Sequence, residues 1–186
     1  MEIKNLCKSF GKKVIFNNFN ATINDGITFI LGESGCGKST LLKMIMGVYS
    51  IDSGKIIYPK GTKFSVVFQE NRLFENLTLE ENIKFVTDKP LNMELVKELS
   101  LNQYLGKKVS ELSGGTKRRV ALLRALSVDF DVLILDEPFT GLDKDVKIDC
   151  MNKILSLDKS ILISTHDESV IDYMRSKTHI DILEVK

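Results

Sequence analysis

The chain has 186 residues, of which 43% are hydrophobic and 27% are charged, so it can bury one substantial core and is not a disordered polymer. Its formal net charge of +1 gives no overall basic field, and we therefore expect no nucleic-acid partner. The amino terminus lacks the apolar segment of a secretory signal, and nowhere do about 20 apolar residues follow one another. We expect a cytoplasmic chain with no direct membrane span.

The three cysteines, Cys7, Cys36 and Cys150, are far apart and have no cysteine or histidine at metal-ligand spacing. Three widely spaced cysteines of this kind fit a protein from a reducing compartment. We expect free thiols, two of them buried and one in a loop, because free cysteine usually behaves as a small apolar side chain.

Short runs rich in β-branched and aromatic residues predict the strands. Several of these runs are apolar at consecutive positions, which is typical of strands that are buried on both faces of a parallel sheet covered by helices. The predicted strands lie at 14–16, 27–31, 64–68, 132–135 and 161–164.

Helical patterns lie between these strands. Residues 38–46 place Leu41, Leu42, Ile45 and Met46 on one face and stop at Gly47. Further helices are predicted at 79–86, 93–99 and 113–127, the last with apolar residues at three-residue spacing. We therefore expect a single domain with an α/β core at 1–69 and 129–186 and a helical subdomain at about 70–128.

Polar residues follow four of the predicted strands at the point where each strand ends. The strand at 27–31 leads into a glycine-rich loop, and the others lead to Gln69, Asp136 and His166. Ligands of open parallel sheets bind outside the carboxyl ends of the strands, so these residues are expected to meet at one edge.

Residues 32–39 match the phosphate-loop pattern of Gly, four residues, Gly-Lys and Ser or Thr. Glycines in such a loop let backbone amides wrap around phosphates. Lys38 adds a positive charge at the outer phosphates, and the Ser39 hydroxyl can bind Mg²⁺.

An acidic pair after a buried strand completes this chemistry. Asp136 is placed to reach a Mg²⁺ ion beside the phosphate loop, and Glu137 is placed to polarise an attacking water. Gln69 can contact the metal or a water, and His166 can donate to an oxygen of the γ-phosphate.

The segment Leu112-Ser113-Gly114-Gly115-Thr116 is a second potential phosphate site, since a glycine turn that opens a helix presents free N–H groups and the positive end of the helix dipole. One nucleotide cannot fill both sites of one chain, so the pattern predicts a nucleotide shared between two chains. The adjacent basic residues 117–119 fit either a nucleic-acid patch or, as we favour, a solvated helix face.

With these motifs in this order, the chain resembles the nucleotide-binding subunits of ATP-binding cassette (ABC) proteins over nearly its whole length. Phe10 falls at the family's adenine-stacking aromatic position, residues 32–40 match Walker A, and Gln69 matches the Q-loop. Residues 112–116 match the signature motif, and 132–137 match Walker B. Residues 141–143 match the D-loop, and His166 matches the switch histidine.

The resemblance implies a P-loop NTPase core with a mostly parallel sheet, an antiparallel β subdomain near the N-terminus and a helical subdomain insertion. It also implies an ATPase whose site is completed by residues of two chains. The implied catalytic residues are Lys38, Gln69, Ser113, Glu137 and His166, and the implied Mg²⁺ ligands are Ser39, Gln69 and Asp136. The implied ATP-binding residues are Phe10, Gly32, Glu33, Ser34, Gly35, Cys36, Gly37, Lys38, Ser39, Thr40, Gln69, Ser113, Gly114, Gly115 and His166.

The resemblance further implies two kinds of partner. Two identical or paired ABC subunits are expected to associate head to tail when ATP is bound, and an integral membrane permease is expected to hold the chain at the cytoplasmic membrane. Residues 70–86 are the expected permease contact, although Phe74, Leu77 and Leu79 fit an ordinary core equally well. Residues 69–73 are similar to the corresponding segment of nitrate, sulfonate and taurine importer ATPases.

Two departures from the family pattern are visible. Thr116 stands where the signature motif usually has Gln, which leaves Ser113 and both glycines in place but puts the rate in question. The chain also ends soon after His166, so no regulatory extension is expected. The alternatives are a soluble ABC ATPase that acts on DNA or ribosomes and a regulator that binds nucleotide without hydrolysing it.

Overall fold

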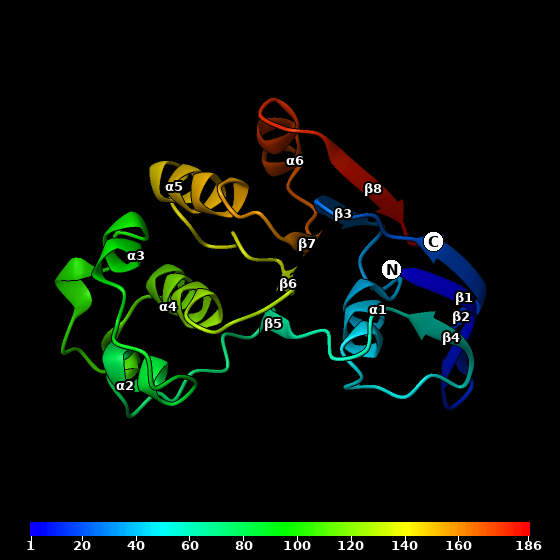
Figure 1. Ribbon diagram of the computed structural model, residues 1–186, viewed down its shortest axis with the longest axis horizontal. Helices are drawn as coiled ribbons and strands as arrows, with labels where there is room; N and C mark the ends of the chain where they lie inside the picture. Colours follow the sequence, from blue (N-terminus) through cyan, green and yellow to red (C-terminus); the bar gives the residue numbers. More distant parts are fainter.

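The computed structural model describes residues 1–186, which form two β-sheets with helices on both sides of the larger one (Figure 1). The strands are β1 (Glu2–Phe10), β2 (Lys13–Thr22), β3 (Ile27–Leu31), β4 (Ser53–Ile57), β5 (Phe64–Val67), β6 (Val132–Asp136), β7 (Ser160–Ser164) and β8 (Ile180–Glu184). The α-helices are α1 (Lys38–Ile45), α2 (Leu79–Lys84), α3 (Met93–Glu98), α4 (Gly114–Leu126), α5 (Lys144–Leu155) and α6 (Glu168–Arg175).

The larger sheet has five parallel strands in the order β5-β6-β7-β3-β8. Successive side chains of its strands enter two different hydrophobic clusters. In β3, for example, Phe29 belongs to one cluster and Ile30 to the other, and both are fully buried. This arrangement confirms the prediction of a parallel sheet with strands buried on both faces.

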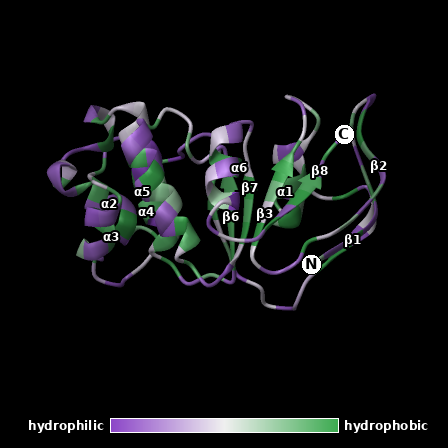
Figure 2. Cartoon of the chain, turned by 90° about the horizontal axis from the view of Figure 1, so that it is seen from above, coloured by the Kyte–Doolittle hydropathy of each residue, from purple (hydrophilic) through white to green (hydrophobic).

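Different elements cover the two faces of the parallel sheet. One cluster contains Val120 of α4, Cys150 of α5 and Val170 of α6, and the other contains Leu41 of α1 and Leu6 of β1. Figure 2 shows the central strands β3, β6 and β7 in the hydrophobic colour, while the flanking helices carry hydrophilic stretches. The sheet is therefore the middle layer of the molecule.

The smaller sheet is antiparallel and has the order β2-β1-β4. It is built from the first 57 residues and lies at the same end of the molecule as α1 in Figure 1. The expected antiparallel sheet near the N-terminus is thus present. Its outer strand β4 is almost entirely exposed, with only Ile56 partly buried.

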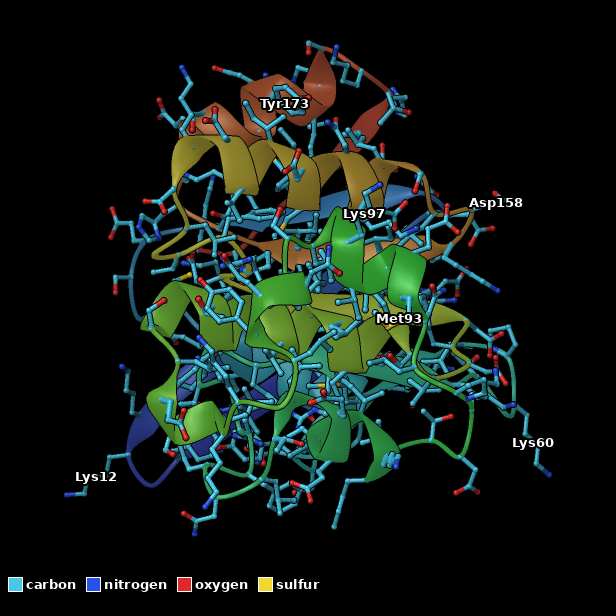
Figure 3. All side chains as sticks on the ribbon, turned by 90° about the vertical axis from the view of Figure 1, so that its left-hand side faces the viewer. Lys12, Lys60, Met93, Lys97, Asp158 and Tyr173 are labelled. Atoms are coloured by element: carbon cyan, nitrogen blue, oxygen red, sulfur yellow. The ribbon has the colours of Figure 1, made fainter.

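Residues 70–128 contain the predicted helices as α2, α3 and α4. Thr78 caps α2 in a capping box with Glu81, and Asn92 caps α3 by accepting from the N–H of Leu95. Figure 3 looks onto this end of the molecule, where Met93 and Lys97 of α3 face the viewer. The apolar sides of these helices belong to the same cluster as Phe29, so this part shares a core with the parallel sheet.

Five of the predicted elements end one or two residues earlier than expected, and five of the strands and α-helices have no counterpart among the predicted ones. The strand predicted at 64–68 ends at Val67, and the helices predicted at 38–46, 79–86, 93–99 and 113–127 end at Ile45, Lys84, Glu98 and Leu126. The unpredicted elements are β1, β4, β8, α5 and α6. The longest helix, α4, has 13 residues, and none of the helices has the length and apolar character of a membrane span.

Candidate functional site

A cavity of about 810 Å³ lies at the carboxyl ends of β3, β5, β6 and β7. Eleven of the residues predicted from the sequence line it, which confirms that these strand ends meet. The lining residues are Lys13, Ile15, Gly32, Ser34, Gly35, Gly37, Lys38, Ser39, Thr40, Gln69, Arg118, Asp136, Glu137, Thr140 and His166.

The phosphate loop connects β3 to α1 and needs its glycines. A Cβ on Gly32 would lie 2.2 Å from the carbonyl oxygen of Val185, and one on Gly37 would lie 2.6 Å from Cγ2 of Ile15. Gly37 also has a φ of 114°, which side chains disfavour. The ammonium of Lys38 folds over the loop and donates to the carbonyls of Gly32 and Glu33 at 2.7 and 3.0 Å.

Asp136 and Glu137 are held firmly by the neighbouring strand β7. Asp136 is only 6% exposed and accepts a hydrogen bond from the hydroxyl of Ser164. The N–H of Glu137 donates to the Ser164 carbonyl at 3.0 Å. Glu137 has a φ of 51°, an uncommon backbone conformation for a side-chain-bearing residue that often occurs at functional sites.

His166 faces Glu137 at the mouth of the cavity. Its Nδ1 lies 2.9 Å from Oε1 of Glu137, and the hydroxyl of Thr165 donates to Oε2 at 3.4 Å. The His166 side chain is 78% exposed, whereas that of Glu137 is 14% exposed. The Glu137 carboxylate is thus oriented by His166 and Thr165, while the His166 ring stays open to solvent.

The three predicted metal ligands, Ser39, Gln69 and Asp136, line the same cavity. Their hydroxyl, amide and carboxylate oxygens are the hard donors that Mg²⁺ prefers when it also binds phosphates and water. The donor set therefore fits Mg²⁺ next to the phosphate loop.

The signature segment lies outside this cavity, because Ser113, Gly114 and Gly115 are not among its lining residues. Ser113 caps α4 by accepting from the N–H of Thr116 at 3.2 Å, so the turn opens a helix as predicted. A Cβ on Gly115 would lie 2.5 Å from the carbonyl oxygen of Gly141, so this glycine packs directly on the segment that follows Glu137.

Thr116, the departure from the signature pattern, is 2% exposed. Its hydroxyl lies 2.9 Å from that of Ser113 and accepts from Nη2 of Arg119 at 3.2 Å. The threonine therefore ties the Ser113 hydroxyl to the body of α4.

The prediction that residues 117–119 form a solvated helix face is wrong. Arg118 and Arg119 are 4% and 7% exposed, and only Lys117 reaches the surface, where it pairs with Glu75 at 2.7 Å. Arg119 donates to the carbonyls of Leu99 and Ser100 at the end of α3. Backbone carbonyls accept hydrogen bonds from both buried guanidiniums, although Nε of Arg119 has no partner. These acceptors could not be anticipated from the sequence pattern.

Several predicted site residues lie away from the cavity lining, and four lining residues were missed. Phe10 is 46% exposed and packs edge-on against Tyr49, with ring centroids 5.5 Å apart. Glu33 and Cys36 belong to the loop but not to the lining. The missed residues are Lys13, Ile15, Arg118 and Thr140, which carry no recognisable motif.

The cysteine prediction is partly wrong, because only Cys150 is buried while Cys7 and Cys36 are partly exposed. Burial raises the pKa of the Cys150 thiol to about 12. Hydrogen bonds with Ser53 and Asn18 lower the pKa of the Cys7 thiol. The Cys7 and Cys150 thiols therefore differ in reactivity.

Comparison with known proteins identifies relatives of this arrangement. The family described as "ABC transporter" matches residues 16–140. The Fe(3+) ions import ATP-binding protein FbpC of Fusobacterium nucleatum subsp. nucleatum is 36% identical over 90% of this chain and 52% of its own length. The spermidine/putrescine import ATP-binding protein PotA of Pasteurella multocida is 34% identical over 90% of this chain and 52% of its own length.

A third relative and a solved structure agree with these matches. The sulfate/thiosulfate import ATP-binding protein CysA of Pectobacterium atrosepticum is 36% identical over 90% of this chain and 59% of its own length. The chain thus spans about half the length of the curated relatives it matches. The ATP-binding cassette MJ0796, solved as a dimer in a post-hydrolysis state with ADP and Pi, superposes with a TM-score of 0.81. It is 27% identical over 100% of this chain and 96% of its own.

Proposed function

Because this chain belongs to the ABC transporter family, we propose that it is the subunit that binds and hydrolyses ATP and drives a separate membrane subunit. The observation that carries the proposal is the single cavity in which the phosphate loop, Gln69, the pair Asp136-Glu137 and His166 converge. The test is release of phosphate from MgATP by the purified chain, alone and with its membrane partner.

The phosphate loop, Glu137 and His166 would have separate roles in attack of water on the γ-phosphate. The loop amides and Lys38 bind the phosphates and offset their negative charge. Glu137 accepts a hydrogen bond, and then a proton, from the attacking water as the new P–O bond forms in line with the bond to ADP that breaks. His166 orients the Glu137 carboxylate through the 2.9 Å contact and would donate a hydrogen bond to an oxygen of the γ-phosphate.

Mg²⁺ would be held by Ser39, Gln69 and Asp136, and when bound it would neutralise charge on the β- and γ-phosphates. The hydrogen bond from the Ser164 hydroxyl fixes the carboxylate of Asp136 for this role.

A second copy of the chain, or a paired ABC subunit, would complete the site. Ser113 and its glycines lie outside the chain's own cavity and open the 13-residue helix α4, so they are available to another chain's ATP. The dimeric form of MJ0796 with ADP and Pi supports both the pairing and the hydrolysis. Closure around ATP and opening after hydrolysis would be the motion passed to the partner.

The membrane partner would bind at residues 70–86. Phe74 and Phe85 are 42% and 66% exposed there, and their rings pack together with centroids 4.3 Å apart. Leu79, which fitted either a contact or the core, is fully buried and is excluded from the contact surface. An exposed aromatic pair of this kind can pack against apolar side chains of another protein.

Replacing Phe85 by Asp is expected to weaken binding to the membrane partner at least tenfold without lowering ATP turnover by the isolated chain, because burying a carboxylate in an apolar contact is costly. The measurement is co-purification with a polytopic membrane protein. Ile182→Asp in β8 also replaces an exposed apolar side chain, 44% exposed, by a carboxylate and should leave binding intact. Equal binding by both variants would remove Phe85 from the contact.

Cys36 provides a probe of nucleotide binding, because its Sγ packs 2.7 Å from the position of a Cβ on Gly32 inside the phosphate loop. In a Cys7→Ser background, N-ethylmaleimide is expected to inhibit ATP turnover, and MgATP is expected to protect. Cys150 should not compete because it is buried. Inhibition that MgATP does not reduce, or that persists in Cys36→Ser, would place the sensitive thiol elsewhere.

The transported substrate stays unassigned. The relatives' names specify iron(III), spermidine and putrescine, and sulfate and thiosulfate, so the match does not select one cargo. The similarity of residues 69–73 to nitrate, sulfonate and taurine importers remains a prediction. The cytoplasmic location at the membrane and the division into a core and a helical subdomain at 70–128 also remain predictions.

Equal background turnover by wild type and Glu137→Gln, with the membrane partner present, would favour a regulator that does not hydrolyse ATP.

A further inference from the structure

Arg118 of α4 is a buried charged side chain whose hydrogen bonds all go to backbone carbonyls of other parts of the chain. Its Nη2 donates to the carbonyl of Gln69 at 2.9 Å and to that of Glu137 at 3.0 Å, with a longer contact of 3.5 Å to the carbonyl of Asp136. Its Nη1 donates to the carbonyl of Phe68. One guanidinium thus joins three parts of the chain: helix α4, the end of β5 and the end of β6.

Removing the Arg118 guanidinium from water costs free energy, and its hydrogen bonds must offset that cost. A buried charge is tolerated only when its donors are satisfied, and Arg118 has carbonyl acceptors but no ion-pair partner within 4.0 Å. Burial lowers the pKa of Arg118, and the nearby carboxylates of Asp136 and Glu137 oppose that shift. The guanidinium stays charged because arginine side chains are not deprotonated in proteins.

Two of the four carbonyls that Arg118 contacts belong to Gln69, a proposed Mg²⁺ ligand, and Glu137, the proposed general base. Glu137 has its N–H held by β7 and its carbonyl held by Arg118, with a φ of 51° between them. A residue in a sparsely populated conformation keeps it only while its surroundings impose it. Removal of Arg118 therefore frees the backbone of Glu137 to relax, and with it the direction of the carboxylate.

We propose that Arg118 is a positioning residue that fixes the backbones of Gln69 and Glu137 against helix α4. The same helix opens with Ser113, which in the proposed function contacts the ATP of the partner chain. Arg118 is thus a rigid link between a chain's own catalytic carboxylate and the helix that touches its partner's nucleotide. This inference rests on the proposed function, since it assigns a role in the ATP hydrolysis proposed above.

The first test compares steady-state turnover of wild type, Arg118→Gln and Arg118→Lys. We expect Arg118→Gln to lower kcat by about 30-fold while KM for ATP changes by less than about threefold, because the reacting groups are misaligned but the phosphate loop is intact. Arg118→Lys keeps the charge and one or two of the hydrogen bonds, so its kcat should lie between the other two. The lysine variant also keeps the test informative if the glutamine variant does not fold.

Arg124→Gln is the matched control. Arg124 lies on the same helix and its guanidinium also donates to backbone carbonyls, those of Arg72 and Asn71, but to none at the catalytic residues. We expect Arg124→Gln and Arg118→Gln to lower thermal stability to a similar extent. Arg124→Gln should nevertheless keep kcat within about threefold of wild type.

A double-mutant cycle separates positioning from general damage. If Arg118 acts through Glu137, Arg118→Gln should lower the residual turnover of Glu137→Gln by less than about twofold, whereas independent effects would multiply. Multiplying effects, or a loss of kcat equal to that in Arg124→Gln, would overturn the proposal. Absence of turnover in the wild type would instead refute the proposed function, so the two failures are distinguishable.

Discussion

Replacing Glu137 by Gln should lower ATP turnover by about 10²- to 10⁴-fold, the usual range for loss of a well-placed general base. The amide cannot take the proton of the attacking water, although it keeps the size and the hydrogen bonds to His166 and Thr165. Nucleotide should still bind, since the phosphate loop is unchanged. The measurement is phosphate release at saturating MgATP.

The same variant should accumulate as a dimer when ATP is added, because opening of the dimer follows hydrolysis in the proposed cycle. Size-exclusion chromatography with and without MgATP would show a shift to twice the monomer mass. Glu98→Gln is a matched control, since it makes the same change at a carboxylate that pairs with Lys153 on the protein surface. A Glu137→Gln protein that hydrolyses ATP at the wild-type rate would remove this residue from catalysis.

Replacing Ser113 by Arg should abolish both the ATP-dependent dimer and turnover, to below about 1% of wild type, since differences of that size follow loss of a group that contacts the reacting phosphate. The long side chain fills the space that another chain's phosphates would occupy and removes the cap of α4, which costs about 1 kcal/mol. Nucleotide binding by the isolated chain should survive, because Ser113 lies outside its own cavity. Ser110→Arg makes the same change on a nearby exposed surface and should retain the dimer.

Mixing the two inactive variants gives the most direct test of a shared site. A dimer of one Ser113→Arg chain and one Glu137→Gln chain has one site with both defects and one with neither, because each site takes its Glu137 and its Ser113 from different chains. Turnover should therefore reappear on mixing. Two outcomes would refute the shared site. One is a Glu137→Gln, Ser113→Arg double variant that dimerises as well as Glu137→Gln alone, and the other is a mixture that stays inactive although mixed dimers form.

Much of the cavity was predictable because its residues follow buried strands directly. The consecutive apolar residues of β3, β6 and β7 predict a parallel sheet, and parallel strands bring their carboxyl ends to one edge. That rule alone places Gln69, Asp136 and His166 beside the phosphate loop, as the cavity lining confirms. The strands β4 and β8 were missed because exposed and polar residues interrupt their apolar pattern.

The role of Arg118 was not predictable by the same means. In the sequence it is the middle of a basic triplet, and such triplets usually face solvent. Its acceptors are carbonyls 18 to 50 residues away along the chain, and carbonyls leave no trace in a sequence. Only the packing of α4 against the ends of β5 and β6 brings them within reach.

The close packing of Gly115 on the carbonyl of Gly141 affects how substitutions at position 115 should be interpreted. Any side chain at position 115 would displace the turn that follows Glu137 in the same chain. In the proposed dimer it would also crowd the phosphates of the partner's nucleotide. A loss-of-function allele such as Gly115→Ala would therefore damage two active centres at once, one in each half of the assembly. Its severity would overstate how much the second glycine of the turn contributes to holding nucleotide.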